Sequence, residues 1–267
     1  MPKSKTLPSS PSQRILNCLP SREIEKDWTF QDAVQAACAQ DAPPPQSVDL
    51  REPSWWEVGD QGRTGSCVGW ASADGLLRWH LVKAGRISQS EGLSVRFVWM
   101  SAKETDEFSS YPSTFIESDG TSLKAALDIM RKFGMVTDAL LPFAQNVLFQ
   151  GGANVFFAQA AKLKIGSYFS LGRDQDAWRS WLASTGPILT RLNVDDTWQA
   201  ASATHGRLDA YKADTVRGGH AVCIVGYTPE RFIIRNSWGN AWGDQGFAHA
   251  SLGYSQSAFT EAYGITL

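Results

Sequence analysis

Three separated segments of the 267-residue chain carry side chains that could work together in nucleophilic catalysis. Cys67 follows a glycine-rich turn at residues 59–66, His220 follows Gly218-Gly219, and Asn236 opens the sequence Asn-Ser-Trp-Gly. A thiol attacks as its thiolate, which a helix N-terminus and a nearby histidinium both favour. Cys67 begins a predicted helix and is therefore the candidate nucleophile. Taken alone, a cysteine at this position is more often a small buried side chain.

His220 begins an apolar strand, from which its ring could act as a base toward the start of a helix. Asn236 closes the next predicted strand, and a tight turn at residues 228–230 would set the two strands side by side. The amide oxygen of Asn236 could then accept the imidazole N–H and orient the ring, while Trp238 shields that hydrogen bond from water. The alternatives are a strand-end histidine that bonds a loop, and a turn with a core aromatic residue.

Gln61 supplies a side-chain amide just before the turn that leads to Cys67. Together with the backbone N–H of Cys67, this amide could bind the oxyanion of a tetrahedral intermediate. Losing one such donor typically costs ~2.7–4 kcal/mol of transition-state stabilisation. A glutamine that only bonds its own loop is an equal alternative. The predicted set is thus Cys67 as nucleophile, His220 as base, Asn236 as the residue that orients the base, and Gln61 as an oxyanion donor.

Together these residues resemble the papain family of cysteine peptidases, in its bacterial or archaeal form, over about residues 48–267. A glutamine stands six positions before the catalytic cysteine in that family, as Gln61 does in this chain (67 − 61 = 6). The family's asparagine follows its histidine by about sixteen positions, and the separation in this chain is 236 − 220 = 16. Residues 236–247, Asn-Ser-Trp-Gly-x-x-Trp-Gly-x-x-Gly-Phe, match the family signature at every fixed position.

The resemblance implies a two-lobed α+β fold, with one helical lobe, one antiparallel β-barrel-like lobe and the active-site cleft between them. Residues 119–123, Asp-Gly-Thr-Ser-Leu, resemble the segment that lines the non-primed side of that cleft. We therefore expect four residues to contact substrate: Gly120, Thr121, Gly219 and Trp238. Thr64 stands where the family's local pattern has a cysteine, and Val68 where it has an aromatic residue. The missing cysteine removes a disulfide typical of lysosomal and plant members, which fits a reducing compartment.

Apolar periodicity predicts helices mainly in the first half of the chain and strands in the second, as in an α+β protein. Helices are expected at residues 67–83, 122–133 and 175–184, with a short one within 21–41. Strands are expected at residues 188–194, 220–227, 231–236, 247–251 and 262–267. We divide the chain into an N-terminal segment, 1–47, and a peptidase domain, 48–267. Within the domain, the helical lobe covers about 48–160 and the β lobe about 161–267.

The N-terminal segment has no pattern of a secretion signal. Residues 1–13 predict a disordered tail and residues 41–46 a stiff linker, so ordered structure is expected to begin near Val48. Residues 14–47 either wrap the body permanently or cross the cleft as an autoinhibitory pro-segment. No apolar run reaches the ~18 residues of a membrane span. We therefore expect a soluble chain made in the cytoplasm, with signal-free export as an effector left open.

The composition, 43% hydrophobic and 19% charged, is that of an ordinary globular protein. A net charge of −2 gives no reason to expect a nucleic-acid partner. The four cysteines and four histidines show no metal-ligand spacing, so we expect no metal and no other cofactor. Nor do four cysteines make a disulfide framework, although single disulfides stay open.

The leading hypothesis is thiol-dependent hydrolysis of peptide bonds in protein or peptide substrates, through an acyl-thioester on Cys67. The same triad could instead serve deamidation, transpeptidation or isopeptide cleavage, because one thioester intermediate suits them all. A non-catalytic peptide-binding module is the third alternative, although such a module has no use for a thiolate.

Overall fold

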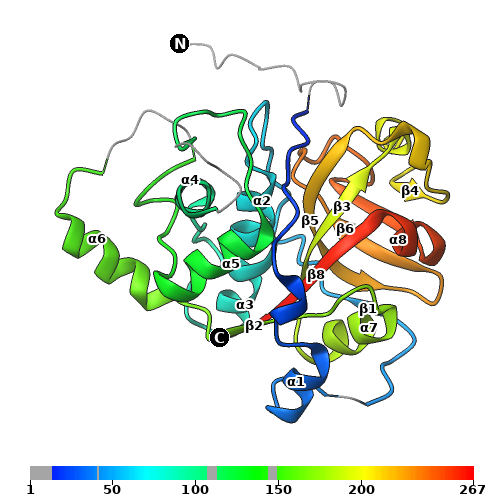
Figure 1. Ribbon diagram of the computed structural model, residues 1–267, viewed down its shortest axis with the longest axis horizontal. Helices are drawn as coiled ribbons and strands as arrows, with labels where there is room; N and C mark the ends of the chain where they lie inside the picture. Colours follow the sequence, from blue (N-terminus) through cyan, green and yellow to red (C-terminus); the bar gives the residue numbers. More distant parts are fainter. Residues whose placement is uncertain (1–13, 41, 107–112, 144–148) are drawn as a thin grey trace.

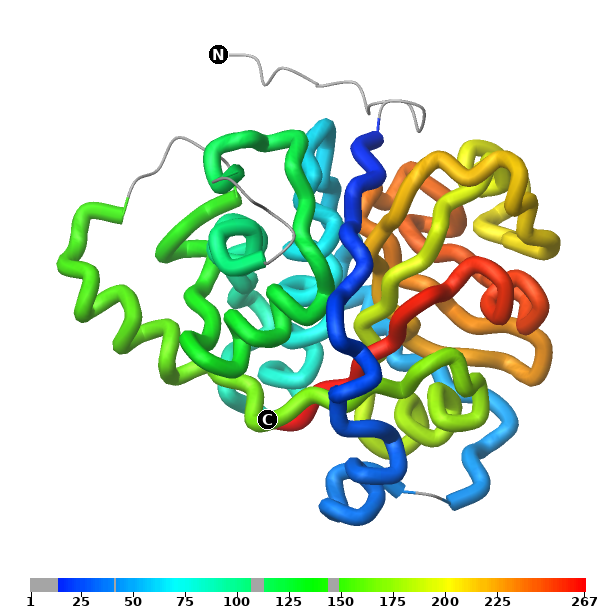
Figure 2. The backbone as a smooth tube through the Cα atoms, viewed as in Figure 1, coloured from blue at the N-terminus to red at the C-terminus, as the bar shows by residue number. Residues whose placement is uncertain are grey.

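The computed structural model describes residues 14–40, 42–106, 113–143 and 149–267. They form a helical lobe and a sheet-containing lobe, as Figure 1 shows, which confirms the expected two-lobed α+β fold. An N-terminal segment runs between the two lobes (Figure 2). The tail predicted at residues 1–13 and the first residue of the predicted linker lie outside the described residues.

The helical lobe contains the helix that begins at the candidate nucleophile. Its elements are α2 (Cys67–Gly69), η3 (Trp70–Leu77), α3 (Arg78–Lys83), α4 (Val95–Thr105), α5 (Leu123–Lys132), α6 (Ala153–Ala160) and η4 (Ala161–Leu163). The side chains of Ser94 and Ser122 cap the N-termini of α4 and α5 by accepting backbone N–H groups of the first turn. The chain turns away after α5 at Gly134, whose φ of 95° suits glycine.

The helix predicted at residues 67–83 forms, but its middle is π-helical. α2, η3 and α3 follow one another without a break. Two glycines allow close packing: a Cβ on Gly69 would lie 2.8 Å from the Cβ of Trp99, and a Cβ on Gly75 would lie 2.9 Å from Sγ of Cys223. The helix is therefore held closely against both α4 and the sheet, and this fixes the position of Cys67.

The second lobe is built on an eight-stranded sheet. Its strands are β1 (Val48–Asp49), β2 (Ser167–Ser170), β3 (Ile188–Val194), β4 (Arg207–Leu208), β5 (Gly218–Tyr227), β6 (Arg231–Arg235), β7 (Phe247–Ser251) and β8 (Phe259–Thr266). They are ordered β2-β8-β3-β5-β6-β7-β4, with β1 added to β5, and only the β4–β7 pair among the described strands is parallel. β2 and β4 end this path without pairing to each other in the described part, so the expected barrel-like sheet is open.

Helices and single turns complete the sheet lobe. They are η2 (Ile24–Lys26), α1 (Phe30–Gln35), α7 (Gln175–Ser184), η5 (Asp196–Gln199), η6 (Ala213–Thr215) and α8 (Leu252–Ala258). Apolar side chains of α1, α7 and α8 form one hydrophobic cluster with strand residues, while the other cluster joins the helical lobe to β3, β5, β6 and β8. The sheet is thus covered on both faces.

All five predicted strands form, three of them with shifted ends. β3 and β7 have the predicted bounds, β5 starts at Gly218, β6 ends before Asn236, and β8 starts at Phe259. β5 and β6 are antiparallel neighbours, as the predicted tight turn requires. The sequence reasoning missed β1, β2, β4, α4, α6 and α8. For α6 there is a physical reason, because it exposes Val155 and Phe157 and so has no one-sided apolar pattern.

The expectation that ordered structure begins near Val48 is wrong. Residues 14–22, named the strap below, cross between the lobes, and Cys18 within it is only 2% exposed. Beyond the strap, Phe30 and Ala33 of α1 are buried against the sheet lobe. The strap is ordered by backbone hydrogen bonds to both lobes rather than by a pattern of its own, so local sequence could not reveal it.

Candidate active site

Cys67 begins the helix of α2, η3 and α3, and its side chain is buried. The pKa of its thiol is held well below the ordinary value, first by a hydrogen bond from the Cys18 thiol and then by His220. The backbone N–H of Ala221 acts in the same direction, whereas burial opposes it because burial disfavours the charged form. The surroundings of Cys67 therefore favour its thiolate.

His220 and Asn236 meet as predicted. Nε2 of His220 lies 2.8 Å from Oδ1 of Asn236, and both side chains are buried. The pairing of β5 with β6 brings them together, because His220 lies near the start of β5 and Asn236 directly follows β6. The amide oxygen accepts a hydrogen bond, which assigns the proton to Nε2. Nδ1 hydrogen-bonds no described residue and is the ring nitrogen left for Cys67.

Two tryptophans enclose this hydrogen bond. The ring centroid of Trp238 lies 5.0 Å from that of His220, and the Trp198 centroid lies 5.6 Å away with its ring nearly perpendicular. Trp198 also stacks on Trp242 at 5.0 Å. Their apolar surface keeps water from the His220–Asn236 pair and so strengthens its hydrogen bond. Trp238 lies where it was predicted, whereas Trp198 was missed because its local sequence contains no link to the histidine.

Gln61 is fully buried beside the nucleophile turn. Its Oε1 accepts a hydrogen bond from Oγ of Ser237 at 2.9 Å, which fixes the orientation of the amide. Its Nε2 donates to the carbonyl oxygen of Thr64 at 3.0 Å and lies 3.5 Å from that of Ile15 in the strap. The amide N–H2 group thus points toward the strap, in agreement with a donor that faces the cleft.

A buried ion pair that sequence reasoning missed connects the two lobes behind the site. Nη2 of Arg235 lies 2.7 Å from Oδ2 of Asp74, and the Arg235 guanidinium also lies 4.8 Å from the centre of the Trp56 ring. Asp74 belongs to η3, the continuation of the nucleophile helix, and Arg235 directly precedes Asn236. The pair therefore holds the helix of Cys67 against the strand that leads to Asn236.

The strap crosses the site on residues that were predicted to contact substrate. The N–H of Cys18 donates to the carbonyl oxygen of Gly219 at 3.0 Å, and the N–H of Leu19 donates to that of Thr121 at 3.1 Å. Gly120 also touches the strap: a Cβ there would lie 2.2 Å from a strap carbonyl oxygen. An extended main chain thus fits closely between the two lobes at this point.

Arg14 anchors the start of the strap. Its guanidinium forms an ion pair with Asp60 and donates to the carbonyl oxygens of Gly62 at 2.9 Å and Trp238 at 3.2 Å. It also lies 5.9 Å from the centre of the Trp238 ring. The side chain of Arg14 is almost fully buried by these contacts. All four residues predicted to contact substrate are therefore covered by the strap.

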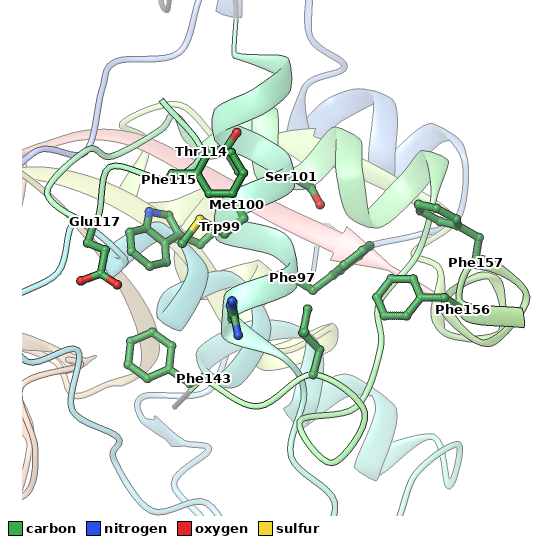
Figure 3. Close-up of a pocket in the computed structure, with 12 residues that line it drawn as sticks. Phe97, Trp99, Met100, Ser101, Thr114, Phe115, Glu117, Phe143, Phe156 and Phe157 are labelled. Atoms are coloured by element: carbon green, nitrogen blue, oxygen red, sulfur yellow. The ribbon is translucent and has the colours of Figure 1, made fainter. Parts of the chain in front are cut away.

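A separate pocket of 560 Å³ lies in the helical lobe, between α4 and α6 (Figure 3). Its walls are mainly aromatic. None of the four predicted catalytic residues lines it. The nucleophile and its base therefore lie elsewhere, beneath the strap.

The described residues hold neither a metal-binding cluster nor a membrane-spanning helix. No group of three or more His, Cys, Asp or Glu side chains among them could hold a metal ion. None of the helices in the described ranges combines the length and the apolar character needed to cross a bilayer.

Comparison with known proteins identifies the family. The model of the papain family cysteine proteases matches residues 44–265. Cysteine proteinase B of Leishmania mexicana is 28% identical over 228 residues, which cover 81% of this chain and 47% of that protein. Cysteine proteinase A of the same organism is 30% identical over 97 residues, 35% of this chain and 26% of that protein. The chain thus spans about a quarter to a half of the length of these Leishmania relatives.

Solved structures share the fold. Xylellain, a cysteine protease from Xylella fastidiosa, superposes with a TM-score of 0.77 at 23% identity and covers 98% of this chain and 99% of its own. Digestive procathepsin L 3 of Tenebrio molitor gives a TM-score of 0.63 at 20% identity, covering 86% and 72% respectively. With a family model that matches most of its length and a fold shared with these structures, the chain belongs to the papain family of cysteine proteases.

Proposed function

We propose that this chain hydrolyses peptide bonds in proteins or peptides through an acyl-thioester on Cys67. The observation that carries the proposal is the buried His220–Asn236 pair, with 2.8 Å between Nε2 and Oδ1, next to a cysteine whose pKa is lowered. Because Asn236 holds the proton on Nε2, Nδ1 can exchange a proton with Cys67 and with the substrate.

In the proposed reaction, the Cys67 thiolate attacks the substrate carbonyl carbon and the C=O electron pair moves onto oxygen. Nε2 of Gln61 and the backbone N–H of Cys67 bind the oxyanion. The intermediate then expels the amine, which takes a proton from Nδ1 of His220 and leaves the acyl-thioester. A water molecule gives a proton to Nδ1 as its oxygen attacks the thioester, and the thiolate leaves with the acid product released.

We infer that substrate binds as an extended chain along Gly120, Thr121 and Gly219 and ends near Trp238. Support comes from the strap, whose N–H groups donate to the carbonyl oxygens of Gly219 and Thr121. Any peptide main chain can form these bonds, because they involve no side chain. Contacts of this kind hold the scissile bond in place without selecting a particular sequence.

We further propose that residues 48–267 form the peptidase domain, with lobes that divide near residue 160, and that residues 1–47 act as a short pro-segment. The strap supports this inhibitory role in two ways. Its N–H groups occupy the carbonyl oxygens of Gly219 and Thr121 as hydrogen-bond acceptors. Its Ile15 carbonyl oxygen lies 3.5 Å from Nε2 of Gln61. A peptide substrate needs the same groups, so the strap must leave before substrate can bind.

An epoxysuccinyl thiol inhibitor tests the nucleophile assignment. Intact mass should show one adduct, peptide mapping should place it on Cys67, and Cys67→Ala should show none. Turnover of peptides in heavy-oxygen water should then leave the heavy oxygen in the new carboxyl group. A lack of any adduct on Cys67 under reducing conditions would contradict the proposal, and transfer of the acyl group to added amines would favour the transpeptidation alternative.

Arg14→Ala tests the inhibitory role within the full chain. The substitution removes the ion pair with Asp60 and the bonds to Gly62 and Trp238, so the strap should open more often and the inhibitor should label Cys67 faster. Lys26→Ala is the matched control, because it removes an ion pair with Glu23 that is exposed and outside the strap. If Arg14→Ala and Lys26→Ala label at the same rate as the unmodified chain, the strap does not limit access.

A further inference from the structure

The strap holds Cys18 at a fixed position above the nucleophile. The N–H of Cys18 donates to the carbonyl oxygen of Gly219, and its own carbonyl oxygen accepts from Nε of Arg191, both at 3.0 Å. The next residue, Leu19, donates its N–H to Thr121 on the opposite lobe. With the main chain bound to both lobes, the Cys18 side chain has little freedom. It is 2% exposed and belongs to the same buried cluster as Cys67.

Within this cluster the Cys18 thiol interacts with Cys67, and this interaction lowers the pKa of Cys67. Burial, followed by the same interaction, raises the pKa of Cys18, whose thiol also lies 3.8 Å from the carbonyl oxygen of Leu19. Cys67 is therefore the member of the pair that ionises more readily, and Cys18 stays a thiol. A thiolate next to a second thiol is the arrangement in which oxidation ends in a disulfide rather than in higher oxides, because the second thiol captures the sulfenic acid.

We propose that Cys18 and Cys67 form a reversible disulfide when a hydroperoxide oxidises the nucleophile, and that this bond locks the strap over the active site. The inference rests on the proposed function for the role of Cys67 as the nucleophile. Its chemistry requires only the two cysteines, His220 and hydrogen peroxide.

The disulfide forms in two steps. When the strap lifts, the Cys67 thiolate attacks one oxygen of hydrogen peroxide, the O–O bond breaks, and the departing hydroxide takes a proton from the histidinium of His220. The products are a sulfenic acid on Cys67 and water. When the strap returns, His220 accepts the Cys18 proton and the Cys18 sulfur attacks the sulfenic sulfur. The S–O bond breaks, and hydroxide takes the proton back from His220 to leave as a second water. Two thiols and one peroxide thus give one disulfide and two waters.

The remaining cysteines are poor candidates for the same reaction. Cys223 is buried, donates to the carbonyl oxygen of Ala71 at 3.1 Å, and has its pKa raised by burial, so its thiolate is scarce. Cys38 is half-buried at the end of α1, and its thiol lies 3.6 Å from the carbonyl oxygen of Ala36. Neither belongs to the strap. Cys38→Ser therefore serves as a matched control that changes one thiol outside the proposed pair.

The test treats the full chain, after reduction and removal of the reductant, with an equimolar amount of hydrogen peroxide. We expect the intact mass to fall by two hydrogen atoms, a digest to contain a peptide that links Cys18 to Cys67, and inhibitor labelling of Cys67 to be lost completely. Dithiothreitol should restore labelling. Cys38→Ser should behave like the unmodified chain. Cys18→Ser should instead give no such linked peptide and carry one added oxygen atom on Cys67. With excess peroxide its Cys67 should reach the sulfinic acid, from which dithiothreitol does not restore labelling.

Peptide mapping of the unmodified chain by mass spectrometry tests the Cys18–Cys67 disulfide even if the Cys18→Ser variant does not fold. A linkage between other cysteines, a linkage between two chains, or oxygen added to Cys67 without any Cys18–Cys67 peptide would overturn the proposal. These outcomes differ from failure of the proposed function. A disulfide that forms in a chain without peptidase turnover would refute only the hydrolysis, and turnover in a chain that forms no such disulfide would refute only the lock.

Discussion

The buried ion pair of Asp74 and Arg235 offers a quantitative test of how the two lobes are held together. Asp74→Ala removes the carboxylate that lies 2.7 Å from Nη2 of Arg235. The Arg235 side chain is 2% exposed, so water cannot replace the lost partner. The carbonyl oxygen of Glu57 and the face of the Trp56 ring are the described contacts that then remain next to its charge.

Removing one partner of a buried ion pair typically costs ~3–5 kcal/mol, because the other charge is left buried without compensation. Asp74 also pairs with Arg78 at 3.1 Å. Arg78 still donates hydrogen bonds to the carbonyl oxygens of Trp55, Gln89 and Glu91, so losing this second pair should add little to the loss of stability. A loss of ~1 kcal/mol lowers Tm by ~2–4 °C in a domain of this size. Asp74→Ala should therefore lower Tm by ~6–20 °C.

Urea and thermal unfolding measure this loss, with every variant built on Cys67→Ala so that self-cleavage cannot interfere. Lys26→Ala, which breaks an exposed pair with Glu23, should leave Tm unchanged. Combining Asp74→Leu with Arg235→Met should recover much of the loss, because no charge is then left buried. A change below ~1 kcal/mol for Asp74→Ala would refute the reasoning. A double variant less stable than Asp74→Ala would show that packing, rather than charge, dominates at this position.

Three further predictions follow from the site and its helix. Gln61→Ala should lower kcat by ~10²–10³ while inhibitor labelling of Cys67 persists, and unchanged kcat would remove Gln61 from the oxyanion site. Because the pKa of Cys67 is lowered, its alkylation by iodoacetamide should reach half its maximal rate well below pH ~8.5, the ordinary pKa of a cysteine. Cys18→Ala removes the first cause of this lowering and should move the midpoint to higher pH. A midpoint that Cys18→Ala leaves in place would argue against the thiol–thiol hydrogen bond. Gly75→Ala should lower the free energy of unfolding in urea by ~1–3 kcal/mol, since its Cβ would lie 2.9 Å from Sγ of Cys223. Gly253→Ala is the control: its Cβ would meet open space and should cause no measurable loss of stability.

The candidate catalytic residues could be assigned from the sequence because their signals are local. Gln61 and Cys67 share one turn, and His220 and Asn236 lie on two strands joined by a tight turn. Such spacings predict contact before any distant part of the chain is considered. The strands β3, β5, β6, β7 and β8 and the helices α5 and α7 were predictable for the same reason, since each shows its own period in the sequence.

Residue types and spacing by themselves determined the α+β class, the candidate nucleophile with its base and the resemblance to the family, and that resemblance implied the two lobes. Only the tertiary structure decided that Arg14, Ile15 and Cys18 lie on the active site, and that Asp74 pairs with Arg235 across 161 positions of chain. The strap has no periodic pattern, because its order comes from main-chain hydrogen bonds and from the ion pair of Arg14 with Asp60, whose partners lie far away in the sequence. Which residues the strap contacts depends on how the two lobes lie against each other, and that arrangement exists only in the folded protein.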